Sequence, residues 1–111
     1  KKYKSGDSHT TLKYVLLVDE NTASASEVLA GAVKDNNGGS IVGTKTFGKG
    51  IVQEVIRFKD KTGMTLTTME YFLPSGENIH KKGIQPDFEI KNENTVTDDK
   101  QLKKALEILK G

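Results

Sequence analysis

The stretch from residue 14 to residue 44 constrains the fold most, because the spacing of its apolar residues changes twice. Residues 14–19 are a short, mostly apolar run, which predicts a strand buried on both faces. From Ser24 the spacing becomes helical, until Gly38 and its neighbours end the helix. Residues 40–44 predict a second strand. Such a strand–helix–strand unit is almost always parallel and right-handed. The helix face expected to pack on the sheet consists of Ala25, Val28, Leu29 and Ala32.

The remainder of the chain predicts a hairpin, an edge strand and a closing helix. Residues 51–58 and 64–73 are rich in β-branched and apolar residues and are separated by a polar loop that ends in glycine, as in a β-hairpin. Residues 84–90 are extended but contain a proline, which favours an edge position. The closing helix is indicated by Leu102, Ala105, Leu106 and Leu109.

Composition excludes several classes of function. The 111 residues suffice for one small core, and the low mean hydropathy of −0.52 indicates a piece of a larger protein. The formal net charge of +2 and the single arginine, Arg57, argue against a nucleic-acid partner. The lack of cysteine excludes disulfides, thiol chemistry and cysteine-bound zinc, and no apolar run is long enough to span a membrane. We expect no cofactor and no metal.

The predicted topology brings Ser24 and Lys49 together, although 25 positions separate them in the sequence. Ser24 follows the first strand, where a parallel unit gathers its functional groups. The helix then runs away from this edge for roughly 18 Å, and the second strand returns by roughly 17 Å. The segment after residue 44, which contains Lys49, should therefore return to the level of Ser24.

A serine and a lysine in contact can act as nucleophile and general base. The lysine must be neutral to accept the hydroxyl proton, so the pKa of its ammonium group must fall from about 10.4 to roughly 7–8. Lys49 lies between glycines and apolar residues with no nearby carboxylate, which favours a desolvated amine. Gln53 would point to the same face of an extended chain and could orient that amine. The positive end of the helix beside Ser24 would favour an oxyanion.

Simpler interpretations of the same residues remain open. Ser24 and Glu27 match the capping box, so Ser24 could be only a helix N-cap, and Lys49 could be only a surface lysine. Asp19 and the adjacent glutamate could bind a metal or form a polar turn. The two histidines, His9 and His80, lie among polar residues and are expected to be exposed.

A phosphate-binding loop competes for the same segment. Residues 43–49 match the pattern G-x-x-x-x-G-K. However, Gly50 stands where a magnesium-binding serine or threonine is required, and the following residues predict a strand instead of a helix. Both departures argue against a nucleotide site.

The motifs resemble those of the carboxyl-terminal processing proteases, also called tail-specific proteases. They cover residues 14–90 in the family's order, and include DENTASASEVLAGA at 19–32, GTKTFGKGIVQ at 43–53, YFLPSG at 71–76 and KGIQPD at 82–87. The resemblance implies that Ser24 is the nucleophile, Lys49 the general base and Gln53 the residue that orients the lysine. It also implies that the backbone N–H of Ala25 is half of the oxyanion hole. One departure is Gly39, where the family usually has a basic residue.

The resemblance further implies an α/β fold with a crotonase/Clp-protease-like β–α–β unit, to which a β-hairpin and a C-terminal helix are added. Residues 1–111 would be the C-terminal portion of the protease domain, an incomplete domain without the family's PDZ domain and the earlier part that supplies the second oxyanion donor. The parent would be an extracytoplasmic, secreted or membrane-anchored protease of the bacterial envelope that cleaves proteins near disordered apolar C-termini.

Two functions therefore remain in competition. The first is a serine endopeptidase with a Ser–Lys dyad, inactive as the isolated fragment. The second is a non-catalytic module of the same fold that captures peptides by adding a strand to an exposed edge. For the isolated chain we also expect homo-oligomers that form through exposed strand edges.

Overall fold

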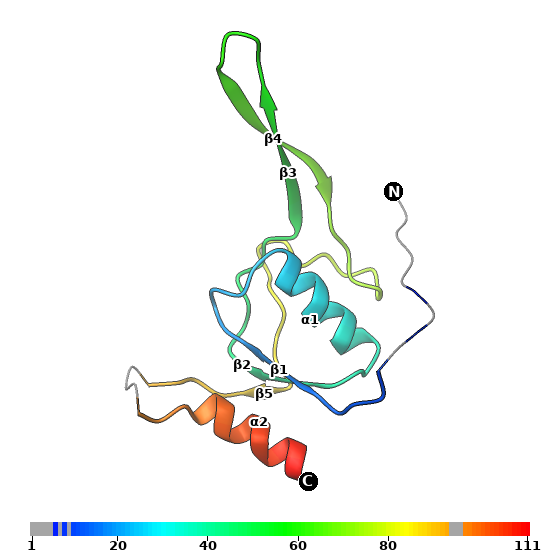
Figure 1. The fold of residues 1–111 in the computed structure, drawn as a ribbon, viewed down its shortest axis with the longest axis vertical. Coiled ribbons are helices and arrows are strands. Elements are labelled where there is room, and N and C mark those ends of the chain that lie inside the picture. Colours follow the sequence, from blue (N-terminus) through cyan, green and yellow to red (C-terminus); the bar gives the residue numbers. More distant parts are fainter. Residues whose placement is uncertain (1–5, 7, 9, 94–96) are drawn as a thin grey trace.

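The computed structural model describes residues 6, 8, 10–93 and 97–111, and these form a mixed α/β structure (Figure 1). A small parallel sheet with a helix on each side makes up the body, and a long hairpin projects from it. The elements in chain order are β1 (Val15–Val18), α1 (Ala25–Asp35), β2 (Ser40–Gly43), β3 (Ile51–Arg57), β4 (Gly63–Glu70), β5 (Phe88–Glu89) and α2 (Lys100–Lys110).

The predicted parallel strand–helix–strand unit is confirmed. β1 pairs with β2 in parallel, from Val15 opposite Ser40 to Val18 opposite Gly43. β5 lies parallel to β2 on its other side, which confirms an edge strand after Pro86. α1 contacts β2, whereas α2 packs against β1 and β2. Among the described residues, no helix is both long and apolar enough to cross a membrane.

The core lies between α1, β2 and the segment that returns after the hairpin. Ile41 of β2 and Ile79 of the returning segment are almost completely buried. Gly31 of α1 allows this packing, because a Cβ atom there would lie 2.0 Å from Cδ2 of Leu73. The buried cluster consists of Val18, Ala30, Val33, Ile41, Leu73, Ile79 and Ile84.

The predicted inner face of α1 is wrong. Val28 is 40% exposed and Leu29 is 57% exposed, although both belong to the apolar stripe. The helix is rotated so that a different set of residues is buried, which includes a charged side chain. This rotation has a specific cause, because the carboxylate of Glu27 is needed in the interior to bind the segment after β2. The buried residues of α1 are Glu27, Ala30, Gly31 and Val33.

The prediction that the first strand is buried on both faces is also wrong. β1 is an edge strand, since the sheet order is β1-β2-β5, and Leu17 is 44% exposed. Within the described residues, one long edge of β1 therefore carries no neighbouring strand.

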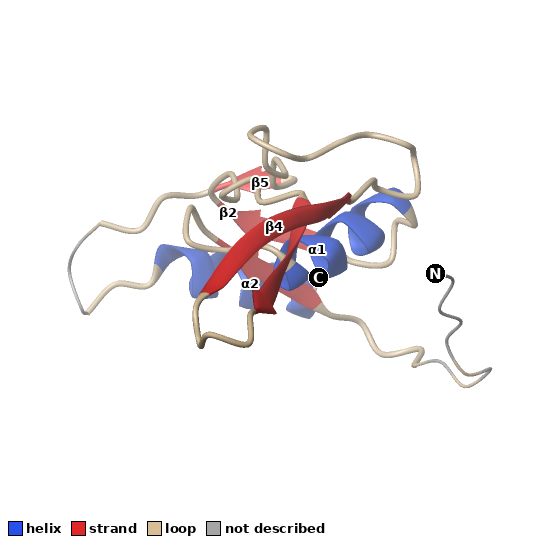
Figure 2. Ribbon diagram, turned by 90° about the horizontal axis from the view of Figure 1, so that it is seen from above, coloured by secondary structure: helices blue, strands red, loops and turns tan. Residues whose placement is uncertain are grey.

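The hairpin of β3 and β4 begins directly after Gly50 and extends away from the body (Figure 1). Seen from above, it lies in front of the body (Figure 2). Its strands pair antiparallel, with a register shift between Val52 and Gln53. At its base, the N–H of Tyr71 donates to the carbonyl of Gly50 at 2.8 Å. Every residue of β3 and β4 except Ile51 is exposed.

Candidate active site

A tight polar turn joins β1 to α1. The Oδ1 atom of Asp19 accepts hydrogen bonds from the N–H of Asn21 at 2.9 Å and of Thr22 at 3.0 Å. The hydroxyl of Thr22 in turn accepts from the N–H of Asp19 at 3.0 Å. These bonds confirm the polar turn as the role of Asp19, and they fix the path of the chain into the helix.

Ser24 closes this turn in an unusual backbone conformation. Its φ of 57° and ψ of −119° lie where few residues with a side chain are found. Such a conformation costs on the order of 1–3 kcal/mol and is found most often at functional sites. The residue is exposed, and Ser24 and Glu27 form a capping box, in which the Ser24 side chain faces the N–H of Glu27 and the Glu27 carboxylate accepts from the N–H of Ser24.

The backbone N–H of Ala25 opens α1 directly after Ser24. In the part of the chain that the structure describes, no acceptor is hydrogen-bonded to this N–H. It lies at the positive end of the helix dipole, where an anion is stabilised. The position thus has the two properties that an oxyanion donor requires, a free N–H and a favourable field.

Glu27 is the centre of the hydrogen-bond network behind Ser24. Its side chain is fully buried. Oε2 accepts from the N–H of Ser24 at 3.0 Å and of Lys49 at 2.8 Å. Oε1 accepts from the hydroxyl of Thr46 at 2.5 Å and from the N–H of Gly48 at 2.7 Å. A single carboxylate therefore joins the start of α1 to the segment that follows β2.

These bonds confirm that the chain returns to the level of Ser24 after β2. The N–H groups of Ser24 and Lys49 donate to the same oxygen atom. A further bond, from the N–H of Phe47 to the carbonyl of Thr22 at 2.9 Å, joins the two turns directly. Because Ile51–Arg57 is a strand and not a helix, the competing phosphate-binding loop is excluded.

The returning segment supports the same loop from its other side. The N–H of Lys81 donates to the carbonyl of Gly48 at 2.8 Å. The backbones approach so closely that a Cβ atom on Gly50 would lie 2.7 Å from the nitrogen of His80. His80 itself is half-buried, and its buried Nδ1 has no hydrogen-bond partner among the described residues, so its predicted exposure is wrong. His9 lies outside the described residues.

The side chain of Lys49 is arranged differently from the prediction. Lys49 is exposed, so the desolvated setting expected for it is wrong in this chain. The physical reason is that its neighbours are themselves uncovered, since Phe47 is 66% exposed and the hairpin leads away into solvent. The amide of Gln53 donates to the hydroxyl of Thr67 across the hairpin at 3.3 Å.

Two residues that organise the site were missed from the sequence. Glu27 was interpreted only as part of a capping box, and Thr46 was assigned no role. Thr46 is 3% exposed, and its hydroxyl both donates to Glu27 and accepts from the N–H of Ile84 at 2.7 Å. The S-x-x-E pattern was visible, but nothing in it indicated that the glutamate also binds residues more than 18 positions away.

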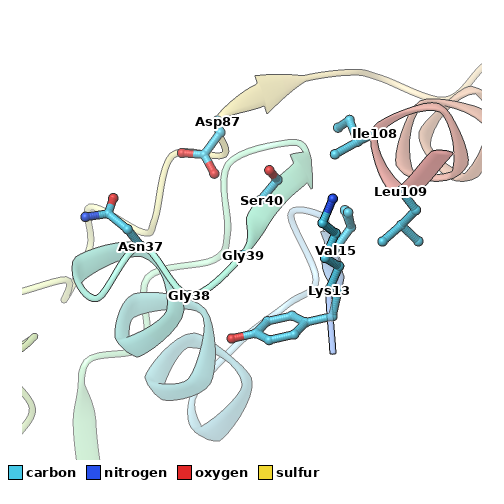
Figure 3. A pocket seen from close by; sticks show the side chains of 10 residues that line it. Lys13, Val15, Asn37, Gly38, Gly39, Ser40, Asp87, Ile108 and Leu109 are labelled. Carbon is cyan, nitrogen blue, oxygen red and sulfur yellow. The ribbon is translucent and has the colours of Figure 1, made fainter. Parts of the chain in front are cut away.

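One cavity of the described structure lies away from the candidate site. It has a volume of about 500 Å³ and lies beside the start of β1 and β2, at the end of the sheet opposite Ser24 (Figure 3). Tyr14 packs over Gly38 and Gly39 there, and this contact fills the place where a side chain at residue 39 would lie. Among the described residues, no three potential metal-binding side chains gather at any point.

Comparison with known proteins gives a consistent result. Residues 1–90 match peptidase family S41. A carboxyl-terminal-processing protease of Synechocystis sp. is 41% identical over 96% of this chain and 26% of its own length. A chloroplastic C-terminal processing peptidase of Tetradesmus obliquus is 48% identical over 83% of this chain and 19% of its own. The solved photosystem II D1 C-terminal processing protease superimposes with a TM-score of 0.70 at 42% identity, over 91% of this chain and 25% of its own. The chain thus spans about a quarter of such relatives.

Proposed function

The chain belongs to peptidase family S41, and from that premise we propose that it carries the nucleophile and the general base of a serine endopeptidase. Ser24 is the nucleophile, Lys49 the base, and Gln53 the residue that orients the lysine. The N–H of Ala25 is one oxyanion donor.

In this mechanism the neutral amine of Lys49 takes the proton of the Ser24 hydroxyl as the oxygen attacks the scissile carbonyl. The negative charge that develops on the carbonyl oxygen is stabilised by the N–H of Ala25. The protonated lysine then donates its proton to the leaving amine, and water hydrolyses the acyl-enzyme by the same route.

The observation that carries the proposal is the geometry at Ser24. An exposed serine is held in a strained conformation, and its N–H shares one carboxylate oxygen with the N–H of Lys49.

The proposal extends to the parent protein. We infer a crotonase/Clp-protease-like protease domain, of which residues 1–111 are the C-terminal portion, in an extracytoplasmic enzyme that also has a PDZ domain. Its substrates are proteins with disordered apolar C-termini. The isolated chain has little activity, because Lys49 is exposed and lacks the dry setting that a lysine base requires, and because a second oxyanion donor comes from elsewhere. The loss of one such donor typically lowers the rate about 10²–10³-fold.

The test is Ser24→Ala in the parent, with Ser26→Ala as the matched control. Both serines are exposed at the start of α1, and both substitutions remove one hydroxyl. Hydrolysis of an unstructured protein should disappear with the first and persist with the second. A well-folded Ser24→Ala parent that retains substantial activity would overturn the proposal.

A second function rests on the free edge of β1. A peptide could add to this edge as a fourth strand without any cleavage, since its backbone groups are not paired with another strand in the described structure. The test measures binding and cleavage of C-terminal peptides by the parent. This non-catalytic function is correct if the native parent binds such peptides without cleaving them and if Ser24→Ala leaves the affinity unchanged.

A further inference from the structure

Tyr71 is hydrogen-bonded to both halves of the candidate site. It follows β4 directly, at the base of the hairpin (Figure 1). Its backbone N–H donates to the carbonyl of Gly50 at 2.8 Å, one residue after Lys49. Its side-chain hydroxyl donates to the carbonyl of Val28 at 3.3 Å, one turn along the helix that Ser24 begins. One residue therefore contacts both the helix of the proposed nucleophile and the loop of the proposed base.

We propose that Tyr71 is a positioning residue, which fixes the first turn of α1 relative to the loop of Lys49 and so keeps the Ser24 hydroxyl within reach of the lysine amine. The inference rests on the proposed roles of Ser24 and Lys49. Both hydrogen bonds of Tyr71 end on backbone carbonyls, so it acts through the placement of the two elements and not on the substrate.

Tyr71 attaches the two elements at places that Glu27 does not reach. The carboxylate of Glu27 joins the N–H groups of Ser24 and Lys49, so its contact ends at the amino side of the lysine. The bond from Tyr71 to Gly50 holds the chain on the carboxyl side of the lysine. On α1, the hydroxyl of Tyr71 binds one turn beyond Ser24. Contacts that are separated in this way fix an orientation as well as a distance.

Proton transfer from a serine to a lysine is sensitive to such placement. The two side-chain atoms must come within about 2.6–3.2 Å of each other. A displacement of about 1 Å that originates far from the chemistry can lower a rate about 100-fold. Ser24 and Lys49 are both exposed in this chain, so the backbone contacts around them, and not burial of their side chains, set their separation here.

The surroundings of Tyr71 suit a hydroxyl that stays in place as a donor. The ring is half-buried and packs against the buried core cluster, which limits its movement. Burial, followed by the negative charge of Asp35, raises the pKa of Tyr71 above its ordinary 10.0. The phenol therefore keeps its proton over the pH range in which a lysine with a pKa of roughly 7–8 acts as a base.

The experiment compares Tyr71→Phe with Tyr14→Phe in the parent. Each substitution removes one hydroxyl and keeps the ring, but Tyr14 lies at the other end of the sheet, over Gly38. Hydrolysis of an unstructured protein is measured, and active sites are counted with a covalent serine reagent that is allowed to react to completion. In Tyr71→Phe, kcat per active site should fall about tenfold with KM within about twofold. Tyr14→Phe should leave both within about twofold.

A second measurement follows the contact itself and does not depend on activity. Hydrogen exchange at the backbone amides of Lys49 and of residue 71 should accelerate in Tyr71→Phe, because the hairpin base is then held to α1 less firmly. The same amides should exchange at the native rate in Tyr14→Phe. A tyrosine whose ring only fills space would show no acceleration, since phenylalanine keeps the ring.

Three results would overturn the role of Tyr71. They are equal kcat values in the two tyrosine variants, a loss in Tyr71→Phe that reflects only fewer active sites, and unchanged exchange at Lys49 and residue 71. Failure of the proposed function looks different, because Ser24→Ala would then keep the activity of the parent, and both ideas would fall. If Ser24→Ala is inactive while both tyrosine variants are fully active, the proposed function stands and only the role of Tyr71 is wrong.

Discussion

Replacing Glu27 by glutamine should break the link between the two halves of the candidate site. A carboxylate can accept all four of the hydrogen bonds that Glu27 receives, whereas an amide has one accepting oxygen and one donating nitrogen. If the amide oxygen faces Thr46 and Gly48, the amide nitrogen faces the N–H groups of Ser24 and Lys49. In the opposite orientation, the amide nitrogen faces the N–H of Gly48, and that hydrogen bond is lost.

The structure gives the magnitude of this loss. The side chain is fully buried, so water does not replace the lost bonds. Each hydrogen bond to a charged group contributes about 1.5–3 kcal/mol, and at most two of the four survive. Glu27→Gln should therefore lower the free energy of unfolding by about 3–6 kcal/mol, a large part of the roughly 5–15 kcal/mol typical of a small domain.

The assay is urea unfolding of the chain, followed by circular dichroism, with Glu20→Gln as the matched control. Glu20 is exposed, and its Oε2 accepts one bond from the hydroxyl of Thr44 at 2.9 Å. This control should lose far less stability than Glu27→Gln, because water replaces a hydrogen bond that is lost at an exposed carboxylate. Hydrogen exchange at the amides of Gly48 and Lys49 gives the local readout and should accelerate in Glu27→Gln alone. Equal and small losses in both variants, with unchanged exchange at these amides, would refute the reasoning.

Two further predictions concern Lys49 and the second helix. In the parent, Lys49→Arg should be as inactive as Lys49→Ala, because an arginine cannot become neutral, and kinetics that show rescue by arginine would rule out a lysine base. Asp99 caps α2. The hydrogen bond from the N–H of Leu102, and to a smaller extent the one from the amide of Asn92, hold the pKa of the Asp99 carboxyl below the ordinary 3.8. The charged cap therefore stabilises α2 above that value, and this contribution is lost as the pH falls below about 4. Acid titration followed by NMR should show fraying at the start of α2 in the native chain, and fraying that is independent of pH would contradict this.

The parts of the fold that follow from local patterns were predictable. The parallel unit of β1, α1 and β2 was visible as two changes in apolar spacing, and the hairpin as two β-branched runs around a polar loop. The proximity of Ser24 and Lys49 followed from lengths alone, because the rise of the helix and the return of the strand nearly cancel.

The orientation of α1 was not predictable in this way. Hydrophobic spacing favours burial of Val28 and Leu29, yet the helix buries Glu27 in their place. The free energy that decides between these faces comes from hydrogen bonds to Thr46, Gly48 and Lys49, which lie 19–22 positions further along the chain. A local stripe contains no information about those partners.

The exposed stripe on α1 and the exposed Lys49 follow from the same rotation. Because Glu27 faces inward to bind the loop from Thr46 to Lys49, Val28 and Leu29 must face outward beside Ser24. The loop itself is held only through its backbone and through Thr46, so nothing in this chain covers the lysine side chain within the described residues. A lysine base needs a dry setting to lose its proton. The apolar surface next to Ser24 is therefore where the desolvating partner of Lys49 would have to pack.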